Sequence, residues 1–339
     1  MSQAFSSTVL LRGVGALLAL VLLAGLGCRS APITGRKQML LLPEDKEVAL
    51  GATAYQETVA KEQLSTNAQY NEMVQRVGQR IAAVSDRKDY QWEFKVIASP
   101  QQNAFCLPGG KVAVHEGILP ICESEAGLAV VMSHEIAHAL ARHGGERISQ
   151  GYAVEAAKQA MSYVTQTQDQ QRQEMIMKAY GAASQYGVIL PYSRKHESEA
   201  DHIGLMLMSK AGYDPAEAPR FWQRFGAANA GQQPMEFFST HPSDANRAAN
   251  LMGLLPEAQQ LYALAPEKLG RGEMLAIAPS TPAAAPATTL PGAPPPPSSL
   301  ASPGLSSGPG AASPSVAPPT VIPTGSSPSI FGPPIRGTP

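Results

Sequence analysis

The sequence has little net charge and few charged side chains. Across its 339 residues, 26 Lys and Arg face 27 Asp and Glu, which gives a formal net charge of -1. A chain without an excess of positive charge lacks the broad basic surface that binds nucleic acid, so no nucleic-acid partner is expected. Only 16% of the residues are charged, against roughly a quarter in an ordinary globular domain. Part of the chain is therefore not expected to be globular.

The missing charges are confined to the two ends of the chain. Arg12 is the only charged residue in 1–27, and 274–335 contains none. Residues 28–273 carry charge at close to the usual globular density. They show no internal repeat at the periods of solenoid proteins, and their length suits one large domain or two small ones.

A long hydrophobic run is also missing. The uncharged stretch after Arg12 ends at Gly27 and is shorter than the roughly 20 apolar residues of a membrane span. It has the length of a signal-peptide core, so we predict a signal peptide over 1–27. The pair Gly27-Cys28 resembles a bacterial lipobox, which predicts acylation of Cys28 and attachment to the membrane through a lipid anchor.

Cleavage before Cys28 predicts a lipid-anchored tether over 28–45. Arg29 follows the cysteine in place of an Asp. By resemblance to lipoprotein sorting, this favours the outer membrane, and the protein is expected in the periplasm. The alternative is an ordinary signal peptide followed by an incidental cysteine.

Residues 271–339 form a compositionally separate tail. Of the 30 prolines in the chain, 18 lie in 274–339, among Ala, Ser, Gly and Thr. Such a segment buries too little apolar surface to offset the entropy of ordering it, so we predict a disordered tail with polyproline II character. A passive tail is the simpler interpretation, and a cell-wall or partner-binding role is the alternative.

Cysteine is scarce, with three in the chain. With Cys28 assigned to the lipid, Cys106 and Cys122 could pair in an oxidising periplasm. The sequence leaves this pairing open, because it does not show whether the two Cα atoms come within bonding reach.

The remaining residues, 46–270, are predicted to form one folded domain. Asn67 opens a segment with the apolar periodicity of an amphipathic helix. Alternation around Phe94 and the β-branched run 111–115 indicate two neighbouring strands. Over about 124–264 the pattern is helical, with Gly and Pro as punctuation. The fold class is therefore α+β, mainly helical.

One helical segment carries a metal-binding pattern. It begins at the N-cap Ser124, contains His134-Glu135-x-x-His138 and is predicted to stop at Gly144. The spacing places both histidines on one face, one turn apart, where they can bind a single Zn²⁺, with Glu135 beside them to hold the attacking water. An otherwise apolar helix gains nothing from burying these groups unless a metal compensates for their desolvation.

A catalytic zinc site needs a third protein ligand and an open fourth position. The metzincin pattern is excluded, because His143 does not stand at that motif's distance from His134. A second predicted helix carries Glu197 and Asp201 on one face, so Glu197 can bind zinc while Asp201 accepts the second N–H of a ligand histidine. Glu199 lies about 200° away around that helix and is expected to be solvated or salt-bridged.

His134-Glu135-x-x-His138 followed by Glu197-x-x-Ala200-Asp201 resembles the zinc metallopeptidase family of the CAAX prenyl protease and HtpX, in particular its periplasmic lipoprotein members such as LoiP and BepA. Further matching motifs occur in the order of that family at 34–36, 103–110, 192–194, 212–215 and 240–242. The resemblance implies a gluzincin domain with a short β-sheet over two metal-binding helices and one Zn²⁺ per chain. It also implies endoproteolysis of unfolded or misassembled envelope proteins.

Two further residues are assigned through the resemblance. Thr240-His241-Pro242 is similar to the family's His-Pro segment, and Pro242 restricts His241 to extended conformations. We assign His241 as the donor to the oxygen on which charge develops, and Arg247 as a candidate for substrate binding. A neutral His241 could also occupy the open zinc position in a resting state. The alternative is a surface His-Pro turn with a salt-bridging arginine.

These parts predict that a zinc-activated water attacks the peptide carbonyl while Glu135 accepts its proton and passes it to the leaving amine. Strand 111–115 is expected to border the cleft and to bind the substrate backbone by β-addition. Two other classes stay open: a non-catalytic zinc-binding periplasmic holdase and a structural lipoprotein of the cell wall. The presence of Glu135, which does not bind the metal, favours catalysis over the holdase. The long ordered-looking middle of the chain argues against the structural role.

Overall fold

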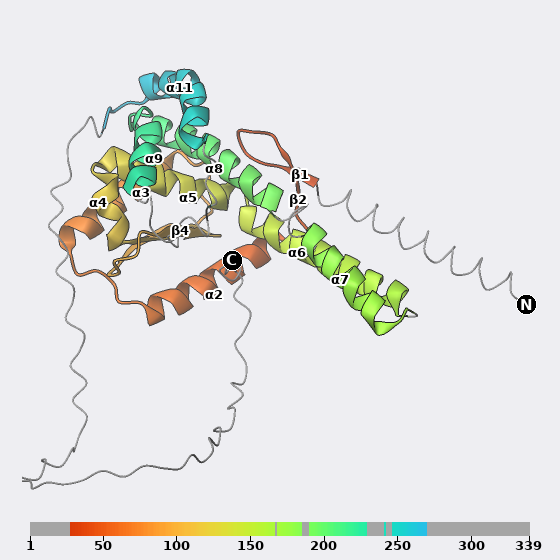
Figure 1. Cartoon of the computed structure of the whole chain (residues 1–339). Helices are drawn as coiled ribbons and strands as arrows, with labels where there is room; N and C mark the ends of the chain where they lie inside the picture. Colours follow the sequence, from red (N-terminus) through yellow and green to blue (C-terminus); the bar gives the residue numbers. More distant parts are fainter. Residues whose placement is uncertain (1–27, 167, 185–189, 229–240, 242–245, 270–339) are drawn as a thin grey trace, which may run out of the picture. The chain divides into compact units, whose positions relative to one another are not determined.

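The computed structural model describes residues 28–166, 168–184, 190–228, 241 and 246–269. The predicted signal peptide 1–27 and tail 271–339 lie outside the described residues. In chain order the elements are β1 (Cys28–Ser30), β2 (Lys37–Met39), α2 (Glu44–Lys61), α3 (Ala68–Ala83), β3 (Glu93–Ile97), β4 (Ala104–Leu107), β5 (Lys111–His115), the 3₁₀ turn Glu116–Ile118, α4 (Leu119–Cys122), α5 (Glu125–Leu140), α6 (His143–Thr165), α7 (Gln170–Ser184), α8 (Leu190–Lys210), α9 (Glu217–Ala228) and α11 (Arg247–Leu264). The predicted α+β, mainly helical class is confirmed (Figure 1).

The larger sheet contains three strands in the order β3-β5-β4. β5 runs parallel to β3 and antiparallel to β4, so Val112 pairs with Phe94 on one side and with Cys106 on the other. The two strands predicted from the sequence are confirmed as neighbours, whereas β4, with four residues, is too short to show a clear alternation. The central position of β5 corrects one expectation about substrate binding. Because both edges of β5 are already paired, strand 111–115 cannot receive a substrate strand.

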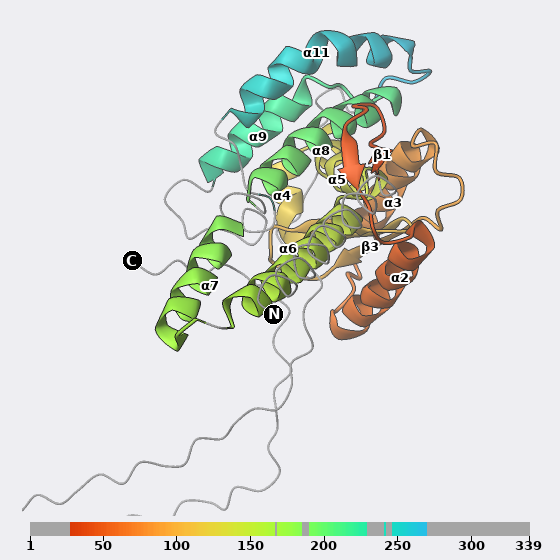
Figure 2. The same ribbon diagram turned by 90° about the vertical axis from the view of Figure 1, so that its right-hand side faces the viewer.

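Helices build outward from one face of this sheet. α3 packs on β3 and α5 on β4; α8 packs on α5, and α11 packs on α8 and α9 (Figure 2). Asn67 caps α3 by accepting a hydrogen bond of 3.2 Å from the backbone N–H of Tyr70. Val74, Val77 and Ile81, the apolar face predicted for this helix, are buried in the main core.

The opposite face of the sheet is covered by α2. A smaller apolar cluster of Tyr55, Ile97, Leu107 and Ala113 fills the space between them. All residues of β5 after Lys111 are buried as a result. The sheet therefore forms a rigid support for α5, the helix that carries the predicted metal ligands.

α5 starts as predicted and ends early. Ser124 is its N-cap and accepts a hydrogen bond of 3.1 Å from the backbone N–H of Gly127. The helix ends at Leu140 instead of continuing to Gly144, and α6 begins almost immediately afterwards.

A tertiary ion pair accounts for this break. Arg142, between the two helices, has a left-handed backbone with φ of 52°. Its buried guanidinium donates from Nε to Oε2 of the buried Glu47 in α2, at 3.1 Å. Gly145 in α6 allows this approach, because a Cβ there would overlap the Glu47 carboxylate. Gly144, the predicted end of α5, and Gly145 both lie inside α6, so neither glycine ends α5.

The segment 28–45, expected as a tether, is folded from its first residue. β1 and β2 pair as an antiparallel hairpin, and Ala31, Gln38 and Leu40 are buried. The Gln38 amide donates to Glu146 of α6 at 3.0 Å. The N-terminal segment is thus packed against the helices that follow α5.

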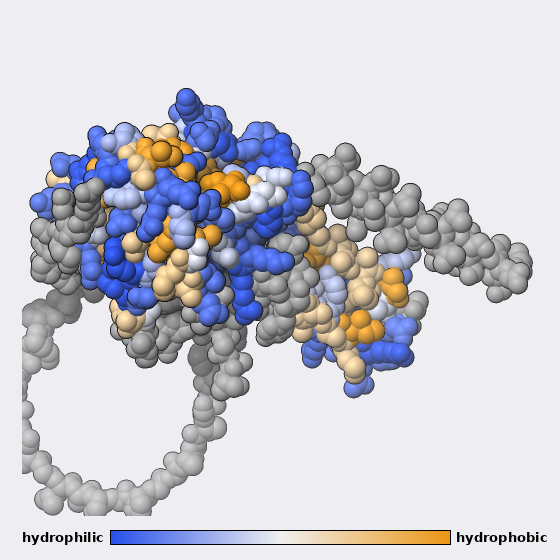
Figure 3. Space-filling view, turned by 90° about the horizontal axis from the view of Figure 1, so that it is seen from above, coloured by the Kyte–Doolittle hydropathy of each residue, from blue (hydrophilic) through white to orange (hydrophobic). Residues whose placement is uncertain are grey.

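α6 and α7 lie side by side and expose large apolar side chains. Tyr152, Tyr163, Val164 and Met175 are each more than half exposed, and Figure 3 shows apolar patches on these helices among hydrophilic side chains. Within the part of the chain that the structure describes, no helix combines the length and apolarity needed to cross a bilayer.

Neither cysteine within the domain is bridged. Cys106 in β4 and Cys122 in α4 are both free. The pairing that the sequence left open is not formed.

A glycine lies where α8 crosses α5. A Cβ at Gly204 would be 3.0 Å from the backbone nitrogen of His134 and 3.1 Å from its Cα. A side chain at this position would require the two helices to shift by a few tenths of an ångström. This close crossing brings the residues of α8 within reach of those on α5.

We predict that Gly204→Ala destabilises the protein by about 1–3 kcal/mol, because the added methyl group has no space between the helices. Gly226→Ala in α9 is the matched control. A Cβ there meets nothing within 4 Å, and replacing an exposed helical glycine should be neutral or stabilising. Urea unfolding of both variants measures the difference. Equal stabilities would show that the helices are not in close contact at Gly204.

Candidate metal centre

Four side chains converge from three parts of the chain. His134 and His138 come from α5, Glu197 from α8, and His241 precedes α11. Each offers one ligand atom, and these atoms lie within 4.8 Å of one another. The Nε2 atoms of His134 and His138 are 3.1 Å apart, and Nδ1 of His241 lies 3.1 Å from Oε2 of Glu197. The structure brings together the three predicted ligands and the predicted oxyanion donor.

The residues present fit a divalent metal ion. Imidazole nitrogens and one carboxylate form the donor set of many catalytic zinc sites. Burial raises the pKa of Glu197, but the neighbouring imidazoles of His241 and His138 outweigh burial and hold that pKa well below its usual range. A buried carboxylate thus stays ionised among histidines, and a bound cation would compensate for the desolvation of the whole group.

Glu135 lies next to this group and is itself buried, with 3% of its surface exposed. Its Oε1 has no hydrogen-bond partner among the described residues and lies 3.5 Å from Nε2 of His241. Burial raises the pKa of Glu135 above its usual value. A carboxyl group with a raised pKa beside a metal site is suited to exchange a proton during a reaction.

Asp201 faces the side of His134 that points away from the cluster. Oδ1 of Asp201 lies 3.1 Å from Nδ1 of His134. This is the position of an acceptor that fixes the tautomer of a ligand histidine and leaves Nε2 toward the metal.

Arg247, expected to bind substrate, is buried and already engaged by the protein. Its Nη2 binds Oδ1 of Asp201 at 2.6 Å, and its guanidinium carbon lies 3.4 Å from the ring centroid of Trp222. Its Nη1 has no hydrogen-bond partner among the described residues and lies 3.8 Å from Glu197. Arg247 therefore orients Asp201, and Nη1 and Nε have no hydrogen-bond partner among the described residues.

Glu199 turns away from the ligand cluster. Its Oε2 accepts from Nε of Arg36 at 2.7 Å and lies 3.0 Å from Nε2 of His143. Sequence reasoning missed Arg36 and His143 as members of the site. The motif at 34–36 was a signal for Arg36. No sequence signal pointed to His143, because side chains five residues apart in a continuous helix point away from each other.

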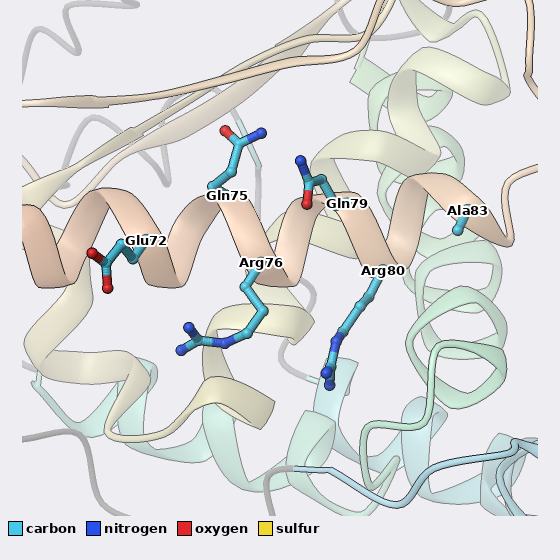
Figure 4. Close-up of a pocket in the computed structure, with 6 residues that line it drawn as sticks. All are labelled: Glu72, Gln75, Arg76, Gln79, Arg80 and Ala83. Atoms are coloured by element: carbon cyan, nitrogen blue, oxygen red, sulfur yellow. The ribbon is translucent and has the colours of Figure 1, made fainter.

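A separate depression of about 480 Å³ lies on the outer face of α3, lined by Glu72, Gln75, Arg76, Gln79, Arg80 and Ala83 (Figure 4). Arg76 is paired with Glu125, and Arg80 with Glu267. This depression contains none of the ligand residues, and its cations are already neutralised. It is not a candidate for the functional site.

The comparison with known families agrees with this geometry. Residues 68–255, more than half of the chain, match the model described as Peptidase family M48. The chain belongs to this family. The match confirms the metallopeptidase family that the motifs suggested, and with it the mainly helical gluzincin fold.

Relatives of this M48 chain include the mitochondrial metalloendopeptidase OMA1 of Schizosaccharomyces pombe, 40% identical over 232 residues that cover 67% of this chain and 66% of the relative. OMA1 of Saccharomyces cerevisiae is 37% identical over 51% of this chain and 49% of the relative. The β-barrel assembly-enhancing protease of Yersinia pestis is 27% identical over 67% of this chain and 49% of the relative.

The chain thus spans from about half to two thirds of the length of these relatives. The narrower expectation, a place in the periplasmic lipoprotein branch, is not confirmed. Among these three relatives, identity is higher with the mitochondrial enzymes than with the bacterial assembly protease.

We predict that Glu197→Ala removes stoichiometric metal from the purified protein, because Glu197 alone supplies a carboxylate to the cluster. Glu199→Ala, on the same helix, should retain metal with at most a weakened affinity. Metal analysis of both variants after gel filtration measures the outcome. Loss of metal from Glu199→Ala but not from Glu197→Ala would show that the ligands are wrongly assigned.

Proposed function

We propose that the chain is a zinc metalloendopeptidase that hydrolyses peptide bonds within proteins. The observation that carries the proposal is a buried carboxylate, Glu135, beside a buried group of metal-ligand side chains in one site. Membership of family M48 and the name metalloendopeptidase given to the relatives support the same reaction. A zinc-binding holdase would need the ligands but not Glu135, so this residue favours the enzyme.

In this proposal His134, His138 and Glu197 hold one Zn²⁺. When bound, zinc supplies a Lewis acid that polarises the peptide carbonyl and lowers the pKa of a water to about 7. Asp201 keeps the proton of His134 on Nδ1, so that Nε2 is free to bind. Arg247 holds Asp201 in place.

Glu135 acts as the general base and then as the general acid. Its carboxylate accepts a proton from the attacking water and donates it to the leaving amine when the peptide bond breaks. The raised pKa of Glu135 suits both steps. Since Glu135 and His134 are neighbours on one rigid helix, the backbone of α5 holds the base next to the metal ligand.

His241 is proposed to donate to the oxygen on which negative charge develops. Its Nε2 lies close to Glu135, and its Nδ1 lies 3.4 Å from Nε2 of His134. The same Nδ1 position would let a neutral His241 serve as a further metal ligand in a resting state. Nη1 of Arg247 is available as a second donor to the substrate.

β4 is proposed to bind the substrate backbone in place of β5. It is an edge strand of the described sheet and packs directly against α5. An extended peptide added to this edge would be held by main-chain hydrogen bonds with little side-chain preference. This mode of binding suits a protease that acts on unfolded chains.

We further propose that the substrates are unfolded or misassembled proteins of the bacterial envelope, and that a lipid on Cys28 holds the enzyme in the periplasm, at the outer membrane. The support is the lipobox-like pair Gly27-Cys28 and the name of the Yersinia relative, which refers to β-barrel assembly. Cys28 opens β1, so a lipid there would hold the domain close to the bilayer. Palmitate labelling of wild type and Cys28→Ser tests this placement.

We predict that Glu135→Gln lowers cleavage of casein or a quenched peptide by at least about a hundredfold, because only the proton-transfer group is removed. Zinc content and melting temperature should stay at wild-type values. Near wild-type turnover by a clean preparation of this variant would end the mechanism proposed here.

We predict that His241→Ala keeps its zinc but lowers kcat by roughly 100-fold, the usual effect of removing one donor to a developing oxyanion. The measurement is kcat and KM for a peptide substrate at full zinc occupancy. A kcat that rises or stays unchanged would contradict the donor role and would favour the resting-state role of His241.

A further inference from the structure

The second ring nitrogen of His138 faces another histidine. Nδ1 of His138 lies 2.9 Å from Nδ1 of His143, and the two ring centroids are 4.8 Å apart. His143 is the first residue of α6 and is buried, with 1% of its surface exposed. Nε2 of His138 points to the ligand cluster instead, so His143 contacts the back of the ligand ring.

This contact determines where the protons lie. When Nε2 of His138 binds a metal, its Nδ1 carries the ring proton and donates it. Two ring nitrogens that face each other cannot both carry hydrogen, so Nδ1 of His143 accepts. The proton of His143 is then on Nε2, which lies 3.0 Å from Oε2 of Glu199.

Glu199 is held in turn by the N-terminal segment. Arg36 donates to its Oε2 at 2.7 Å, and the Thr34 hydroxyl donates to its Oε1. Arg36 also binds Glu146 through Nη1 and Nη2, at 3.0 and 2.7 Å. His138 thus donates to His143, and His143 donates to Glu199, a carboxylate that Arg36 and Thr34 hold in place.

The break between α5 and α6 is needed for this arrangement. In one continuous helix, side chains five residues apart point about 140° away from each other, and His143 could not reach His138. The left-handed backbone of Arg142 turns the chain so that it can. Thr34 and Arg36, at the other end of the hydrogen-bond chain, lie before the 68–255 match to the family model.

We propose that His143 is a positioning residue for His138, orienting the ligand ring and maintaining the tautomer that leaves Nε2 free for the metal. This inference rests on the proposed metal site. It makes the two ligand histidines of α5 unequal. His134 contacts the carboxylate of Asp201 directly. His138 instead contacts the imidazole of His143, which in turn contacts the carboxylate of Glu199, held by Arg36.

The test compares His143→Leu and His143→Asn in the full-length protein. Leucine keeps much of the volume without an acceptor, whereas Oδ1 of asparagine restores an acceptor close to the position of Nδ1. We expect His143→Leu to weaken zinc binding by about 10–100-fold in competition with a chelator, and His143→Asn to recover most of the loss. The absorption spectrum of the Co²⁺-loaded protein should change in the leucine variant and return toward wild type in the asparagine variant.

His196→Leu is the matched control. His196 is equally buried, stacks on His143 with ring centroids 4.3 Å apart and binds Glu146, not His138. Its loss should lower the melting temperature without changing the zinc dissociation constant. If His143 and His196 served only to stabilise the fold, His143→Leu and His196→Leu would weaken zinc binding by the same factor.

Wild-type zinc affinity in His143→Leu would overturn the proposal, and so would an equal loss in His143→Leu, His143→Asn and His196→Leu. A wild-type protein that binds no zinc would overturn the proposed function together with this inference. A wild type that binds zinc and cleaves peptide, next to a His143→Leu variant of unchanged affinity, would overturn this inference alone.

Discussion

The burial of polar side chains on an apolar helix is the constraint on which the rest of the structure depends. α5 is almost entirely buried and carries His134, Glu135 and His138 within its last turns. Each group loses its water on folding and must find a partner in the protein or in a bound metal. The close crossing of α8, with glycine at position 204, brings Glu197 to the ligand cluster and Asp201 behind His134.

Residues that precede the family match pair with buried charges on the elements around α5, not with its own His134, Glu135 and His138. Arg36 binds Glu146 and Glu199 together, while Arg142 pairs with Glu47 of α2. Buried charges are tolerated when they are paired and hydrogen-bonded. Removing one partner leaves the other charge buried and unpaired, which strongly destabilises the folded protein. The N-terminal hairpin and α2 therefore belong to the structure that holds the metal ligands, although no predicted ligand lies on them.

Sequence reasoning found the site residues that belong to a recognisable motif, including the distant Glu197 and His241, and missed contacts between elements that no motif marks. The N-cap at Ser124 and the fold class follow from patterns within single helices and strands. The early end of α5 could not be predicted, because the competing interaction is the Arg142 pair with Glu47, which lies 95 residues away in the chain. β4 was not predicted, because four residues are too few to show a clear alternation. Since β4 is an edge strand and β5 is not, the proposed substrate contact is with β4.

By itself the sequence determined the helix with its two histidines and Glu135, the shared face of Glu197 and Asp201, and membership of a metallopeptidase family. The helix and the shared face depend on the helical repeat and on hydrogen bonds between neighbouring residues, and the family follows from the motifs. Only the tertiary structure decided that Arg247 binds Asp201 and that His143 faces His138. Both depend on burial and on partners supplied by other elements; the carboxylate behind His143 is 56 residues further along the chain. A buried side chain takes the partner that the folded chain places beside it, and spacing along one helix does not specify that partner.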